Sequence, residues 1–176
     1  MIEAIAKVRG LSTALVACSY GAAVLTLTWL TQDGHVGDAM YGVMAMILMA
    51  FPLSLAGGSL YGTLQQLIYP KNHDDPTYGV DYPYAWDYVL MAWPGVVMAI
   101  VLASLLAWRR TRTAGRVMGW VLAAAVIVTG MGTIFDSWGP RRPYGLPYLV
   151  YGLIMIIGLI AVNRRSAVEK AVTTDV

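Results

Sequence analysis

Five long apolar runs divide the chain, and they constrain its fold more than any other feature. They cover residues 11–31, 40–68, 88–108, 117–135 and 144–163. A helix needs about 20 mainly apolar residues to cross a bilayer, because the hydrocarbon core is about 30 Å thick. The runs are continuously apolar, whereas the strands of a membrane β-barrel alternate between apolar and polar residues. We therefore expect an all-α integral membrane protein built as a bundle of five transmembrane helices.

The composition agrees with a chain whose solvent is lipid. Hydrophobic residues make up 58% of the 176 residues and charged residues only 12%, with a mean hydropathy of +0.61. An ordinary soluble domain has about 25% charged residues. The runs and their short connections use nearly the whole length, which predicts a single transmembrane helical domain over residues 1–176. The net charge of +2 is small, so we expect the lipid bilayer, and no nucleic acid, as a partner.

The second run, residues 40–68, is the least regular of the five. As one straight helix it would measure about 44 Å, well beyond the thickness of the hydrocarbon core. Pro52 lacks a backbone donor and Gly57 and Gly58 follow it, which predicts a bend near the middle. Since a long apolar segment is most simply a full helix, we expect a span here. The alternative is a fold of four spans plus a re-entrant segment at 40–68, which enters and leaves the membrane on one side.

Small residues recur every four positions in the second run, and the same spacing begins just before the fourth. Such residues allow another helix to approach closely. The predicted helix-packing residues are Ala50, Ser54, Gly58 and Gly62 in the second run, and Gly115 and Gly119 around the start of the fourth. The pattern predicts helix association, either within this chain or with another chain.

Arginines between the third and fourth runs orient the chain. Lys and Arg concentrate in cytoplasmic loops, so we expect this connection on the cytoplasmic side of the cell membrane. Its arginines are Arg109, Arg110, Arg112 and Arg116. Five spans would place seven basic residues inside and five outside, whereas the re-entrant alternative would place nine inside and three outside. Both arrangements put the loops 69–87 and 136–144 on the extracytoplasmic side.

The loop 69–87 is the one long polar interval, and it holds four of the ten acidic residues and one of the two histidines. Carboxylates and an imidazole can ligate calcium or zinc. The candidate ligands are His73, Asp74, Asp75 and Asp81. Their spacing matches no standard metal site, and aspartate next to proline is typical of turns. We therefore predict no metal and no cofactor, and keep these four residues only as candidates.

Aromatic residues in the same loop suggest a contact surface. Tyr and Trp bury large areas at a modest entropic cost and are enriched at protein interfaces. The predicted docking residues are Tyr78, Tyr82, Tyr84, Trp86 and Asp87. The other interpretation is an aromatic belt that lies on the lipid headgroups, and the two are compatible.

Arg141 and Arg142 lie in a proline-rich segment between the fourth and fifth runs. Guanidinium groups form strong paired hydrogen bonds with carboxylates and with phosphates. These arginines could therefore pair with aspartates of the external loops, or they could contact lipid phosphates.

The apolar runs hold no acidic, basic or histidine side chain near their middle, although proton relays and ion-coupled transporters usually need one there. No catalytic residue set or phosphate-binding loop is recognisable. We expect a non-catalytic accessory or assembly subunit of a larger membrane complex, with other membrane subunits or a second copy as partners.

One alternative is a small homo-oligomeric channel or lipid or small-solute transporter, in which Pro94 acts as a hinge. Its predicted lining residues are Ser54, Ser59, Thr63, Gln65 and Gln66. A second alternative is a membrane enzyme that uses His73 and the loop aspartates.

Overall fold

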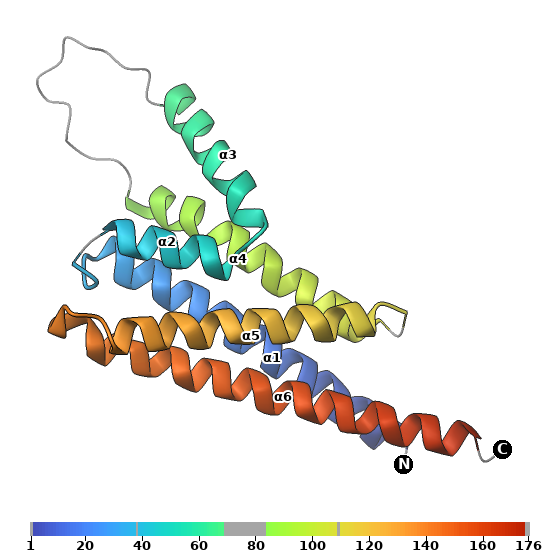
Figure 1. Cartoon of the computed structure of the whole chain (residues 1–176). Helices are drawn as coiled ribbons and strands as arrows, with labels where there is room; N and C mark the ends of the chain where they lie inside the picture. Colours follow the sequence, from blue (N-terminus) through green and yellow to red (C-terminus); the bar gives the residue numbers. More distant parts are fainter. Residues whose placement is uncertain (1, 38, 69–83, 109, 175–176) are drawn as a thin grey trace, which may run out of the picture. The chain divides into compact units, whose positions relative to one another are not determined.

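The computed structural model describes residues 2–37, 39–68, 84–108 and 110–174, and these are helical, with short connections and no strand (Figure 1). The elements are α1 (Ile2–Gln32), α2 (Ala39–Met49), α3 (Leu53–Ile68), α4 (Tyr84–Ala107), α5 (Arg112–Ile134), the 3-10 helix η1 (Gly139–Arg141) and α6 (Arg142–Thr174). The all-α prediction is confirmed for this part of the chain.

Three helical segments are long and apolar enough to cross a membrane: Gly10–Gln32, Arg112–Ile134 and Gly139–Asn163. Two shorter apolar helices cover Met40–Met49 and Met91–Ala107. These segments indicate a membrane protein. The bundle of five spans is not confirmed, because the second and third runs do not yield described apolar helices of spanning length.

The second run forms two helices instead of one bent helix. The turn between α2 and α3 contains the cis peptide bond Phe51–Pro52. The N–H of Ser54 already donates to the carbonyl of Ala50 at 3.0 Å, and its hydroxyl donates to the carbonyl of Ile47 at 3.0 Å. Figure 1 shows that α3 then leaves the end of α2 at a steep angle. The predicted bend is therefore a complete break between two helices.

The described chain divides into two compact units, residues 1–23 with 98–176 and residues 24–97. In the first unit, α5 and α6 lie antiparallel beside each other (Figure 1). Their backbones approach closely: a Cβ atom added to Gly145 would lie 2.6 Å from the carbonyl oxygen of Gly130. The start of α1 packs on α6, where an added Cβ at Gly158 would lie 2.5 Å from Val16. Glycines thus bring these helices together.

The second unit contains the last turns of α1, the α2–α3 pair and the first half of α4. A Cβ atom at Gly42 of α2 would overlap the side chain of Thr31 on α1, and one at Gly57 of α3 would lie 2.7 Å from Pro94 on α4. Both halves of the broken run are therefore packed against longer helices. The prediction of a single domain stays a prediction.

The predicted packing residues occupy different environments. Ala50 is buried in the turn before α3, and Ser54 is half-buried at the start of α3. The burial of Gly58 and Gly62 lies outside what the structure describes. Gly115 and Gly119 are buried. Added Cβ atoms there would lie 2.9 Å from the backbone of α4 at Leu105 and 2.7 Å from Leu159 on α6, respectively.

Candidate functional site

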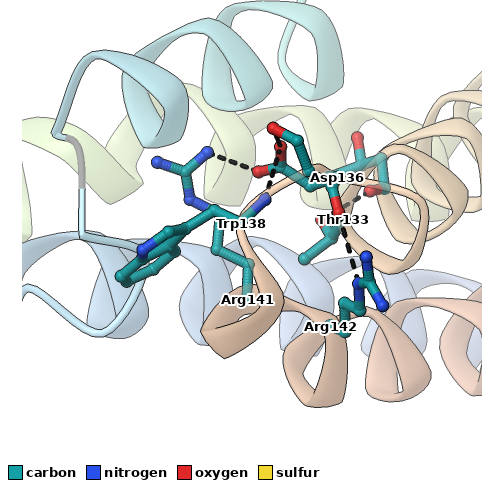
Figure 2. A network of polar contacts seen from close by, with 7 residues as sticks. Thr133, Asp136, Trp138, Arg141 and Arg142 are labelled. Carbon is teal, nitrogen blue, oxygen red and sulfur yellow. Dashed lines mark hydrogen bonds and ion pairs between the residues drawn. The ribbon is translucent and has the colours of Figure 1, made fainter.

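The turn between α5 and α6 holds a connected group of polar side chains (Figure 2). Helix α5 ends where the N–H of Phe135 donates to the carbonyl of Met131 at 2.9 Å. Asp136 follows at once. Its carboxylate accepts hydrogen bonds from the Ser137 hydroxyl at 3.3 Å and from the backbone N–H of Trp138 at 3.4 Å. This is the local pattern by which aspartate shapes a turn.

Arg141 completes this turn. Its Nη1 lies 2.5 Å from Oδ2 of Asp136 in an ion pair, and both side chains are partly buried. The guanidinium also lies 4.9 Å from the centre of the Trp138 ring, within the range of a cation–π contact. The hydrogen bond from Arg141 is the main cause that lowers the pKa of Asp136 below its ordinary value. The charges of Asp136 and Arg141 therefore offset each other.

Arg142 occupies a different position, although it is the next residue. Its Nε donates to the backbone carbonyl of Asp136 at 3.3 Å, and its side chain is exposed. Within the described residues, no carboxylate forms an ion pair with Arg142. Phe135 and Trp138 nearby are 76% and 41% exposed. The turn thus presents one unpaired positive charge beside exposed aromatic rings.

A second polar group joins α1 to α4 within the second unit. The Tyr88 hydroxyl donates to Oδ1 of Asp33. Gln32 directly precedes Asp33, and its Nε2 lies 3.2 Å from the sulfur of Met91, which is one turn beyond Tyr88 on α4. The chain leaves α1 through Gly34 and Gly37, whose φ angles of 69° and 71° favour glycine. These contacts hold the end of α1 against the start of α4, and we interpret them as structural.

Several predicted site residues lie outside the described residues. They are His73, Asp74, Asp75, Tyr78, Asp81 and Tyr82. Tyr84, Trp86 and Asp87 lie in the first turn of α4, so this helix begins four residues before the predicted span, and their side chains are not described. Early acidic residues such as Asp87 favour a helix N-terminus, which explains the longer helix. Among the described residues, no group of three His, Cys, Asp or Glu side chains could hold a metal ion.

The predicted channel-lining residues can be followed only in part. Ser59 and Thr63 are exposed on α3, where their hydroxyls donate to the carbonyls of Leu55 and Ser59. Pro94 is buried against Gly57. Nothing is described of the side chains of Gln65 and Gln66. The Asp33–Tyr88 and Gln32–Met91 contacts were not predicted, and the only signal for them is that these residues stand at or near the ends of apolar runs.

No protein-family model, curated protein or solved structure matches this chain.

Proposed function

We propose that this protein crosses the cell membrane four times, through α1, α4, α5 and α6, and that α2 and α3 form a re-entrant pair. At about 1.5 Å per residue, the 11 residues of α2 reach about 16 Å and the 16 residues of α3 about 24 Å, less than the hydrocarbon thickness of about 30 Å. The 24 residues of α4 reach about 36 Å, enough to cross.

The charge distribution supports the same topology. With a re-entrant pair, both chain ends and the connection between α4 and α5 face the cytoplasm. The cytoplasmic side then holds nine basic residues and the outside three, as the tendency of Lys and Arg to stay inside requires. The connections 33–38, 69–83 and 135–141 are extracytoplasmic in this arrangement.

We further propose that the protein is a non-catalytic accessory or assembly subunit of a larger membrane complex. The observation that carries this proposal is the exposed break between α2 and α3. Helix α2 begins near the end of α1 and ends about 16 Å further on, close to the bilayer midplane. Phe51 in the break is nevertheless 58% exposed. Non-helical backbone at this depth is tolerated only where protein or water covers it.

The free face of α3 supports a protein partner. Gly57 faces Pro94 on α4, so residues two positions away on either side, Leu55 and Ser59, lie on the opposite face at 3.6 residues per turn. Both are exposed, as is Thr63. Hydroxyl-bearing residues are enriched where membrane helices pack on one another. This face and the break form one surface that a partner helix would cover.

A second candidate function rests on the same break. Broken helices also occur where they line a water-filled path, and the exposed hydroxyls of Ser59 and Thr63 suit such a path. The protein would then be a small homo-oligomeric channel or transporter, with α3 facing the centre.

Cysteine labelling tests the topology. Cys18, the one cysteine of the chain, is replaced by serine, and single cysteines are placed at Asp33, Thr77 or Thr113. A membrane-impermeant maleimide on intact cells should label the first two and not the third. Labelling at Thr77 but not at Asp33 would support five spans instead.

Photo-crosslinking tests the role. A photoreactive residue replaces Leu55, which is 60% exposed on α3, or in a matched control Leu153, which is 57% exposed on α6. In native membranes we expect a stoichiometric product with another polypeptide at Leu55, and lipid adducts at Leu153. A ladder of self-products together with solute flux in liposomes would favour the channel. Lipid adducts alone at both positions would contradict both functions.

A further inference from the structure

The turn between α5 and α6 carries an uncompensated positive charge at a defined place. Asp136 supplies the one carboxylate among the described residues of this turn, and Arg141 binds it through an ion pair at 2.5 Å. Among the described residues, the hydrogen-bond partner of Arg142 is the backbone oxygen of Asp136, which accepts from Nε. A carbonyl oxygen carries no formal charge, so the charge of Arg142 is left to a group outside the turn.

The position of Arg142 along the chain places it at the membrane surface. The apolar segment Gly139–Asn163 begins three residues before it. Phe135 and Trp138 of the same turn are exposed, and aromatic side chains favour the boundary between hydrocarbon and water. The phosphate groups of phospholipids lie at this boundary, so the nearest abundant anion to Arg142 is a lipid phosphate.

The side-chain geometry fits that anion. The bond from Nε to Asp136 fixes one edge of the guanidinium, while both terminal nitrogens of Arg142 have no described protein partner. Two parallel N–H groups of arginine match two oxygens of a phosphate. We propose that Arg142 binds the phosphate of a phospholipid headgroup at the α5–α6 turn. This proposal rests on membrane insertion and not on the accessory role, so it is tested on the purified chain alone.

Arg141 and Arg142 look equivalent in the sequence, but they have different partners in the structure. Arg141 is occupied by Asp136 and by the Trp138 ring, and the pKa of Asp136 is lowered by this contact, which keeps the carboxylate charged. Arg142 is therefore the lipid-binding residue, and Arg141 becomes a second one only if Asp136 is neutralised.

Native mass spectrometry of the full-length protein, titrated with phosphatidylglycerol or phosphatidylethanolamine, measures the affinity for the first bound lipid. For Arg142→Gln we expect an affinity lower by roughly tenfold for both lipids, the usual size of a charge-assisted hydrogen bond. For Arg142→Lys the loss should be smaller, because lysine keeps the charge without the paired N–H groups. For Asp136→Asn the affinity should rise, because Arg141 is released.

Three outcomes would overturn the proposal. Unchanged lipid affinity in Arg142→Gln would show that Arg142 does not bind the lipid. An equal loss in Arg110→Gln, which removes one exposed charge from the connection between α4 and α5, would show a dependence on net charge alone. Displacement of the lipid by millimolar inorganic phosphate would identify a site for the free anion. Melting temperatures of the variants in detergent check that each variant is folded. A rise in lipid affinity in Asp136→Asn is a gain of binding, which damage to the turn would not produce.

Discussion

Gly145 lies where the backbones of α5 and α6 approach closely, and Gly145→Ala should weaken this pair measurably. The added Cβ would lie 2.5 Å from Cγ1 of Ile134 and 2.6 Å from the carbonyl oxygen of Gly130. Carbon atoms in good contact are about 3.5–4.0 Å apart, so the helices must separate by roughly 1 Å, because a backbone carbonyl cannot rotate away. Overpacking of this kind costs about 1–3 kcal/mol, and alanine returns about 0.5–1 kcal/mol through its better helix propensity. We expect a net loss of roughly 1–2 kcal/mol.

Two matched glycines make the test sharp. A Cβ at Gly130 would lie 3.0 Å from the carbonyl oxygen of Gly145, so Gly130→Ala should lose less. Gly10 in α1 has nothing within 4 Å, so Gly10→Ala should only gain from propensity. The free energy of unfolding is measured by titrating SDS into detergent micelles. If Gly145→Ala proves as stable as Gly10→Ala, the backbone contact between α5 and α6 is not tight, and the reasoning fails.

Three further predictions concern polar groups. The hydrogen bond from Arg141 lowers the pKa of Asp136 in the folded protein. The stabilisation from this ion pair is therefore present above the ordinary carboxyl pKa of about 3.9 and is lost as the pH falls through the lowered value. The melting temperature of the wild type should fall below about pH 4, and that of Asp136→Asn should fall by less. Trp93 buries an indole N–H that has no hydrogen-bond partner among the described residues. In Trp93→Phe, removing this N–H should return about 1–3 kcal/mol of desolvation and so offset the cost of the smaller ring, leaving the free energy of SDS unfolding little changed. A loss well beyond the cost of the smaller ring would show that the N–H has a partner. Tyr88→Phe removes an exposed bond to Asp33 and should cost about 1 kcal/mol or less in SDS unfolding.

The helices themselves could be predicted because their signal is local. Each predicted span lies on a helix or, for 40–68, on two, since a run of about 20 apolar residues has few other solutions in lipid. The ends could not be predicted as well. Helix α1 begins at Ile2 and α6 continues to Thr174, because charged and alanine-rich segments beyond the apolar runs are still good helix formers.

The break at Pro52 is a feature that the local sequence predicts only in part. A missing N–H and two later glycines predict an interruption, but they carry no information about the direction in which the chain continues. That direction depends on contacts between distant residues, Gly42 on Thr31 and Gly57 on Pro94. The same holds for Arg141 and Arg142, which look equivalent in sequence. Only the turn geometry pairs one with Asp136 and leaves the other exposed.

The two-helix form of the second run has a consequence for how the protein is made. While it emerges from the ribosome, 40–68 is one continuous apolar stretch that insertion machinery can read as an ordinary span. Its α3 half finds a docking surface only when Pro94 of α4 has been synthesised to receive Gly57. In the proposed topology the final arrangement of this stretch is therefore decided late, by a helix that follows it. Chains that stop before α4 should leave 40–68 threaded through the bilayer, with the acidic loop on the wrong side.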